Sequence, residues 1–276
     1  MSSSVIRSKD NPLVRTFRLV AAQARRAPAD LVLAEGIRVL EEATHSHCRI
    51  EAALASESFG SHPREKALLA AWQSRGVAMH RAADAVLKVL SEVAAMQGAL
   101  ALVRVPARSL KDMPVCTRPL ILCLCEIRDP GNLGALLRSA RAAGATWAAS
   151  TCGSVSAGNP KAVRAGAGST FHLPLVEGLQ PAALIDYCSS REIPVYRADA
   201  GRGTPCWEVD LRGAAALLLG NEARGLGGDF WSGIPAIRIP MATGAESLNV
   251  AAAGAVLLFE ARRQRSGILA TSPDRT

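Results

Sequence analysis

Hydrophobic and polar positions in the second half of the chain alternate between short apolar runs and helical periods. The run from 119 to 126, PLILCLCE, is continuously apolar over strand length, as the centre of a parallel sheet requires. Asn132 begins a helical period that reaches Ala143 and ends at Gly144. Further strands are expected at 146–150, 195–198, 215–219 and 236–239, a helix opening at 160–161, and a last helix over about 247–264. This succession predicts an α/β fold with a parallel sheet.

The first half shows a shorter βα alternation. Strands are expected at 31–34, 50–55, 77–79 and 99–103, and helices at 37–44, 63–75 and 82–90. Asp10-Asn11-Pro12 is expected to interrupt any amphipathic helix in the basic N-terminal segment. Three prolines and little periodicity over 105–119 indicate a connection between domains. We therefore expect a smaller α/β domain over 1–105, a linker over 106–118, a larger domain over 119–266 and a flexible tail over 267–276.

Composition adds a basic balance to this picture. The chain has 276 residues, of which 49% are hydrophobic and 4% aromatic, so a sizeable core is expected. The formal net charge is +8, which favours polyanion partners because Lys and Arg displace the counterions of phosphates. A basic enzyme without a nucleic-acid partner is equally compatible with composition alone.

Cysteine usage favours a reducing compartment such as the cytoplasm. Seven cysteines contain no CxxC pair, against both a disulfide framework and a zinc ribbon. Cys123 and Cys125 are expected to point the same way from a buried strand. His45, His47 and Cys48 form a small cluster without a second half, so no metal is expected. Because no apolar stretch approaches the roughly 20 residues of a membrane-spanning helix, no membrane association is expected either.

Three loops at predicted strand ends carry the candidate chemistry, since ligands of open α/β sheets bind there. The first is EIRDPGNLGALLRSARAAGA from 126 to 145, where Asn132 is a good helix N-cap and Arg138 and Arg141 lie three apart. The second is LLLGNEARGLGGD from 217 to 229. In the third, IRIPMATGAESLNVAAAG, Ser247 or Asn249 can cap an Ala-rich helix. Taken alone, each is also explained as an ordinary helix cap or turn.

Familiar cofactor loops are missing from the sequence. GxGxxG does not follow any predicted strand, and the GAGST at 166–170 lacks the lysine of a phosphate-binding loop. A dinucleotide site and a nucleotide-dependent enzyme are therefore disfavoured. The residues by themselves indicate a basic α/β protein with three loop clusters.

Taken together, the three loops resemble the three motifs of the SpoU (TrmH-like) family of SPOUT RNA 2′-O-ribose methyltransferases. NLGALLRSA resembles the first motif, LLLGNEARGL the second and IPMATGAESLNVAAAGAVLLFE the third, in the family's order. NPKAVRAGAGSTFHLPLV (159–176) is similar to the family's intervening segment. IRSKDNPLVR and AEGIRVLEEA resemble the accessory domain of ribosomal RNA members. One departure is Ala251, where serine is often found in the family.

The resemblance implies a fold and a cofactor. The fold is a SPOUT trefoil-knotted parallel sheet, preceded by a smaller α/β RNA-binding domain that resembles a ribosomal protein. It implies that S-adenosylmethionine binds in the knot, and that the protein is an obligate homodimer. The implied cofactor-binding residues are Gly220, Asn221, Ile239, Pro240, Met241 and Leu248.

The resemblance also implies a catalytic set of Arg138, Asn132, Glu222, Ser247 and Asn249. Arg138 is the central residue. It either accepts the hydroxyl proton with help from phosphate and a serine, or binds the adjacent phosphate and stabilises the developing alkoxide. The second role respects the high pKa of arginine.

The implied substrate is RNA, with ribosomal RNA favoured over transfer RNA by the accessory domain. The basic N-terminal domain is expected to hold the RNA, with candidate contacts at Arg7, Lys9, Arg15 and Arg18. Alternatives are a transfer RNA ribose methyltransferase, a base methyltransferase of the same fold, and a non-catalytic ribosome-binding protein. The last would be expected to lack Asn132, Arg138 or Glu222.

Overall fold

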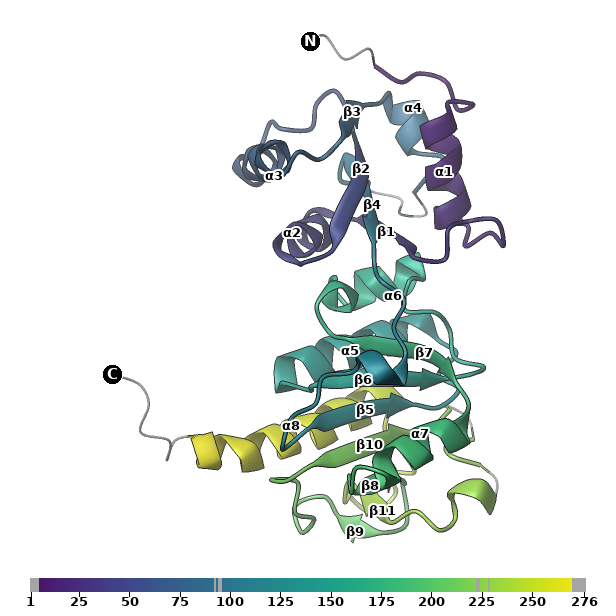
Figure 1. The fold of residues 1–276 in the computed structure, drawn as a ribbon, viewed down its shortest axis with the longest axis vertical. Helices are drawn as coiled ribbons and strands as arrows, with labels where there is room; N and C mark the ends of the chain where they lie inside the picture. The colour runs from purple at the N-terminus through teal and green to yellow at the C-terminus, as the bar shows by residue number, and fades with distance from the viewer. Residues whose placement is uncertain (1–4, 92, 94–95, 222–223, 228, 270–276) are drawn as a thin grey trace. The chain divides into compact units, whose positions relative to one another are not determined.

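The computed structural model describes residues 5–91, 93, 96–221, 224–227 and 229–269 (Figure 1). The chain forms two compact units, each with its own sheet and core. Unit 1 consists of 1–107 together with 157–172, and unit 2 of 108–156 together with 173–276. Unit 1 is therefore discontinuous in sequence.

The sheet of unit 1 has four strands in the order β1-β4-β2-β3. β4 pairs antiparallel with both β1 and β2, whereas β3 pairs parallel with β2. The strands are β1 (Leu31–Glu35), β2 (Arg49–Ala55), β3 (Met79–Arg81) and β4 (Ala99–Arg104). The helices are α1 (Pro12–Ala21), α2 (Ile37–His45), α3 (Pro63–Ser74), α4 (Asp84–Leu87) and α6 (Pro160–Ala165).

Alternation along the central strand β4 builds a core on each face of this sheet. Leu100 and Leu102 pack with α1 and α4, and Ala101 and Val103 pack with α2, α3 and α6. Figure 1 shows α1 and α4 on one side of the strands and α2 and α3 on the other. Both faces are covered, which explains why the strand is apolar from Ala99 to Val103.

The N-terminal segment corrects one expectation. Asn11 and Pro12 do not interrupt a helix but begin α1: the Asn11 side chain accepts a hydrogen bond from the N–H of Leu13 at 2.9 Å. Proline is favourable in the first turn, where its missing N–H costs nothing. The other elements of unit 1 lie close to their expected positions, although β3 begins at Met79 and α4 has a single turn.

The segment 157–172 completes unit 1. Val163 of α6 and Phe171 are buried in the core beneath α2. Arg164 donates to the buried Glu35 carboxylate at 3.0 Å, and His172 Nε2 lies 2.9 Å from Glu42 Oε2. The part of the sequence between the first and second motifs thus supplies structure to the N-terminal unit.

Unit 2 contains a sheet of seven strands in the order β7-β6-β5-β10-β8-β11-β9, and every recorded pairing is parallel. The strands are β5 (Leu120–Leu124), β6 (Trp147–Thr151), β7 (Leu175–Leu179), β8 (Val195–Ala198), β9 (Thr204–Pro205), β10 (Ala215–Leu219) and β11 (Ala236–Arg238). The helices are α5 (Pro130–Ala143), α7 (Pro181–Ser189) and α8 (Val250–Leu269).

The central strands of unit 2 are buried on both faces. Ile121, Cys123 and Cys125 pack with Leu184 and Tyr187 of α7 on one face, which confirms that the two cysteines point the same way. α5 and α8 pack together on the other face (Figure 1). This two-sided cover is what the uninterrupted apolar run predicted.

Several differences from the expected elements concern unit 2, among them the short strand β9, which was not expected. β7 and α7 were not expected, because LVEGL is not strongly apolar and the α7 sequence lacks a clear polar face. α8 begins at Val250 and continues to Leu269, beyond the expected end near Gln264. Within the described residues, none of the helices combines the length and apolar character needed to cross a bilayer.

Candidate active site

A cavity of about 390 Å³ lies in unit 2 at the carboxyl ends of β8, β10 and β11. Its apolar wall includes Leu219, Ile237, Ile239, Leu248 and Leu257. Among the described residues, its polar lining consists of Arg197, Asp199, Asn221, Arg224 and Ser247. The volume falls in the range of roughly 300–1,000 Å³ typical of small-molecule pockets, and the wall combines apolar and polar surface.

The loop after β10 forms one side of the cavity. Asn221 and Gly225 exchange backbone hydrogen bonds at 3.0 and 2.8 Å, which close the chain tightly on itself. A Cβ atom at Gly220 would overlap the backbone of Gly225, so only glycine fits there. The loop therefore presents backbone groups to the cavity at close range.

The first and third sequence loops meet through two asparagines. Asn249 Nδ2 donates to Asn132 Oδ1 at 3.0 Å, while Asn249 Oδ1 accepts from the N–H of Ala251 at 2.9 Å. The expectation that Asn249 caps the last helix is thus confirmed. The expectation that Asn132 is an N-cap is wrong: Asp129 caps α5, and the N–H of Asn132 donates to its carboxylate at 2.8 Å. The Asn132 side chain contacts the third loop instead of capping the helix.

The remaining predicted site residues have different surroundings. Asn221, Ile239, Met241, Ser247 and Leu248 line the cavity together with Gly220, whereas half-buried Pro240 does not. Arg138 is exposed on α5, and no hydrogen bond or ion pair holds its guanidinium among the described residues. Glu222 lies outside the described residues.

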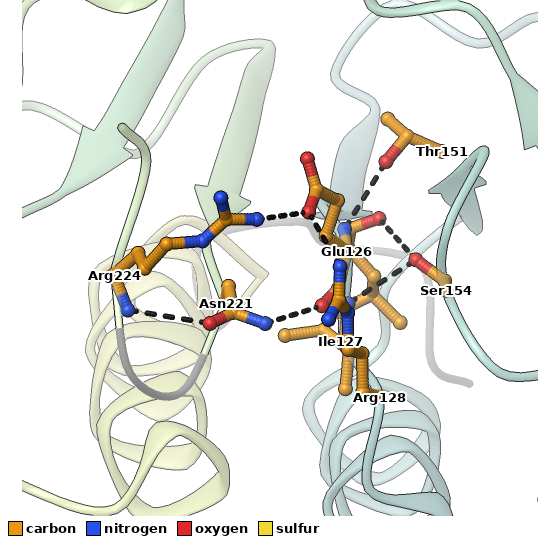
Figure 2. Close-up of polar contacts among 8 residues, drawn as sticks. Glu126, Ile127, Arg128, Thr151, Ser154, Asn221 and Arg224 are labelled. Atoms are coloured by element: carbon orange, nitrogen blue, oxygen red, sulfur yellow. Dashed lines mark hydrogen bonds and ion pairs between the residues drawn. The ribbon is translucent and has the colours of Figure 1, made fainter. Parts of the chain in front are cut away.

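One cluster at the site was not singled out from the sequence (Figure 2). Glu126 follows β5 and has a left-handed backbone, with φ of 54°. Its carbonyl accepts from Asn221 Nδ2 at 3.0 Å, and its carboxylate accepts from Arg224 at 2.7 Å and from Arg128 at 3.4 Å. Glu126 thus joins the end of β5 to the loop that lines the cavity.

The ion pair of Arg197 and Asp199 at the end of β8 was not predicted from the sequence either. Arg197 donates to Asp199 at 2.6 Å, and the N–H groups of Gly201 and Arg202 donate to the same carboxylate at 3.0 and 2.9 Å. Partial burial disfavours the charged form, but these donors outweigh it and lower the pKa of Asp199 below its ordinary value. The cavity therefore contains a fixed carboxylate at neutral pH. The only sequence signal was a polar residue directly after a strand.

The candidate RNA contacts lie on unit 1. Arg7, Lys9, Arg15 and Arg18 are all exposed. Arg15 and Arg18 belong to the outer side of α1, whose inner side buries Val14 and Phe17. The Arg18 side chain also donates to the backbone carbonyl of Lys9 at 2.5 Å, which holds the segment before α1 close to the helix.

Comparison with known proteins places both units in one enzyme family. The model of the SpoU rRNA methylase family matches residues 119–259, and that of an MRM3-like substrate binding domain matches 11–101. A 23S rRNA (uridine(2479)-2′-O)-methyltransferase of Streptomyces viridochromogenes is 30% identical, with 92% of this chain and 91% of that protein covered. The 23S rRNA (guanosine(2553)-2′-O)-methyltransferase RlmP of Bacillus subtilis is 26% identical, over 93% of this chain and 98% of its own.

A solved structure is similar as well. The SpoU methyltransferase AviRb from Streptomyces viridochromogenes, in complex with the cofactor AdoMet, superposes with a TM-score of 0.81 at 28% identity, covering 93% of this chain and 98% of its own. The fold expected from the three motifs, a SPOUT parallel sheet preceded by a smaller α/β domain, is thereby confirmed. This chain belongs to the SpoU rRNA methylase family.

Proposed function

We propose that this protein transfers a methyl group from S-adenosylmethionine to a ribose 2′-hydroxyl of ribosomal RNA. The observation that carries the proposal is the convergence of residues from the second and third motifs on one cavity within the region matched by the family model. The names of both relatives, each a 23S rRNA 2′-O-methyltransferase aligned over more than nine tenths of this chain, support the substrate and the ribose oxygen.

The cavity suits the proposed cofactor. Leu219, Ile237 and Leu248 offer apolar surface to an adenine ring, and the close-packed loop at Gly220 offers backbone hydrogen-bonding groups. Asn221 and Asp199 supply acceptors for hydroxyl or ammonium groups. When bound, S-adenosylmethionine supplies an activated methyl group on a sulfonium centre. The protein's share is to hold the ribose oxygen in line with that methyl group and to exclude competing water.

The proposed catalytic residues are Arg138, Asn132, Glu222, Ser247 and Asn249. The bond between Asn249 and Asn132 supports this set, since it fixes the start of α8 against the first turn of α5. Arg138 acts on the RNA: its guanidinium binds the phosphate beside the target ribose and stabilises the negative charge that develops on the 2′-oxygen as that oxygen bonds to the methyl group and the hydroxyl proton passes to water.

The proposal includes a homodimer and a knotted chain. Val256 and Phe259 are 43% and 49% exposed on the outer side of α8, which leaves apolar surface for a second copy to cover. Arg138 is absent from the lining of the cavity, as expected if it serves the site of a partner. β10 pairs with β5, and α8, which comes later in the chain, packs against α5. This arrangement supports the proposal that the C-terminal segment is threaded through an earlier loop.

Unit 1 is proposed to hold the RNA through Arg7, Lys9, Arg15 and Arg18, in the cytoplasm. The match of 11–101 to a substrate binding domain supports this division of labour. Reversing the charge of Arg15 and Arg18 together is expected to raise the KM for RNA and flatten its salt dependence, because each lost phosphate contact removes nearly one released counterion. The affinity for S-adenosylmethionine is expected to stay unchanged.

The test of the function itself uses Arg138→Ala and the wild type. Calorimetry is expected to give the same affinity of both proteins for S-adenosylmethionine. Transfer of a labelled methyl group to ribosomal RNA, with the product mapped by ribose-specific cleavage protection, is expected only from the wild type. A wild-type protein that binds no S-adenosylmethionine, or that labels a base, would contradict the proposed function. Turnover by Arg138→Ala would remove that residue from the mechanism.

A further inference from the structure

The backbone of Glu126 adopts a conformation that residues with side chains rarely take. Its φ of 54° lies in the left-handed region that glycine adopts freely and other side chains rarely adopt. Glu192 in the same unit has nearly the same φ, 52°, but follows a helix end, where such a conformation commonly closes a turn. Strained residues that persist tend to cluster at functional sites, so the contacts of Glu126 are informative.

Those contacts hold every part of Glu126 in place (Figure 2). Its N–H donates to Thr151 Oγ1 at 3.1 Å, and its carbonyl accepts from Asn221 at 3.0 Å. A Cβ atom at Gly153 would lie 3.3 Å from its Cγ, so the side-chain stem runs close over that glycine. The carboxylate is thereby aimed at Arg224, which donates to it at 2.7 Å.

The charges around the cavity give this carboxylate a role. Among the described residues the charged lining consists of Arg197, Asp199 and Arg224. Asp199 balances Arg197, and Glu126 balances Arg224 from just outside the lining. Arg128 also contacts the Glu126 carboxylate at 3.4 Å. Among the described residues no other carboxylate contacts Arg224, so loss of the Glu126 charge would leave the Arg224 guanidinium without its counter-charge there.

A methyl donor and its product respond differently to such a charge. S-adenosylmethionine and S-adenosylhomocysteine differ only at sulfur: the donor has the methyl group and the positive sulfonium charge, and the product has neither. An uncompensated guanidinium in the cavity wall repels the first by Coulomb interaction and leaves the second nearly unaffected. A balancing carboxylate therefore favours substrate over product.

We propose that Glu126 is a positioning and specificity-determining residue that holds and neutralises Arg224, so that the cavity accepts the cationic methyl donor in preference to the neutral product. The proposal rests on the proposed function, because it takes S-adenosylmethionine to be the ligand of this cavity. It adds a residue outside the predicted catalytic and cofactor-binding set.

The experiment measures the affinities of S-adenosylmethionine and S-adenosylhomocysteine by calorimetry for the wild type, Glu126→Gln and Glu192→Gln. The glutamine at 126 keeps the size and an acceptor for Arg224 but removes the charge. We expect about fivefold weaker binding of S-adenosylmethionine, a modest figure because the pair is partly exposed to water, with S-adenosylhomocysteine changed less than about twofold. Lowering the salt concentration is expected to widen the difference. Glu192→Gln, with the same residue type and backbone, is expected to match the wild type.

Equal affinities of wild type and Glu126→Gln for both ligands would overturn the proposal, and so would an equal loss for both, which a purely structural role predicts. A wild-type protein that binds neither ligand would instead contradict the proposed function. Glu126→Gly and Glu192→Gly provide the control for strain. Both relieve the left-handed backbone, and only the change at 126 is expected to alter the ratio of the two affinities.

Discussion

The ion pair between Arg164 and Glu35 makes the packing of 157–172 against the N-terminal part of unit 1 testable. Glu35 is only 3% exposed, and its carboxylate accepts from Arg164 at 3.0 Å and from the hydroxyl of Ser91. Arg164→Ala removes the cation and leaves the buried carboxylate with a single neutral donor. The variant is therefore expected to lose stability in unit 1 rather than in unit 2.

The expected loss is about 3 kcal/mol. Breaking a buried ion pair by removing one partner costs about 3–5 kcal/mol, mostly because an uncompensated charge stays behind. The lower end applies because Arg164 is 25% exposed, so water can partly replace it. Arg104 is the matched control: it pairs with Asp30 and Glu51 in the same unit, but it is 41% exposed, and Arg104→Ala is expected to cost clearly less than Arg164→Ala.

Hydrogen exchange read peptide by peptide is the suitable assay, because two units need not unfold in a single step. Arg164→Ala is expected to speed exchange in β1 and in 157–172 by about two orders of magnitude, which corresponds to roughly 3 kcal/mol. Exchange in β5 and β10 of unit 2 is expected to stay unchanged. If Arg164→Ala costs no more than Arg104→Ala, the reasoning about burial is refuted.

Three further predictions concern unit 2. Gly254→Ala is expected to lower the free energy of unfolding of the protein in urea by about 1–3 kcal/mol, because the added Cβ would overlap two buried leucine side chains. This cost outweighs the better helix propensity of alanine. A gain in stability would contradict this packing. Gly220→Ala is expected to weaken S-adenosylmethionine binding at least about tenfold by displacing the backbone of Gly225, whereas Gly213→Ala, which has open space, should bind normally in the same titration. Burial raises the pKa of Cys188 to about 11 from its ordinary 9.0, so the stability that its protonated thiol contributes is complete below pH 9 and is lost as the pH rises toward 11. The urea midpoint of unfolding is therefore expected to drop less between pH 8 and pH 10.5 in Cys188→Ala than in the wild type. An equal drop in both proteins would refute this link between pKa and stability.

Elements with strong local signals could be predicted from the sequence. The continuous apolar run of β5 and the helix that ends at Gly144 with a left-handed cap were both expected, and both are present. β7 and α7 were not, because their residues carry a weak pattern and their positions depend on pairing with β6 and packing on Cys123. Periodicity reports burial along a segment but not which distant segment covers it.

The candidate site shows the same division. Gly220, Asn221 and Leu248 could be named from motifs, since motifs record residue types in a fixed order. Glu126 could not, because its importance lies in a backbone angle and in contacts with residues about a hundred positions away. Asn132 was assigned as the helix cap on propensity alone, and Asp129, three residues earlier, occupies that place.

The discontinuity of unit 1 has a consequence for synthesis on the ribosome. The first 107 residues leave the ribosome with the apolar surface that Val163 and Phe171 later cover still open to water. The stretch from 108 to 172 follows roughly 3–13 s later, at about 5–20 residues per second. During that interval β5, α5 and β6 of unit 2 are already made. The nascent chain must therefore begin its second sheet before its first core is closed, and a fragment cut at 107 would keep that open surface permanently.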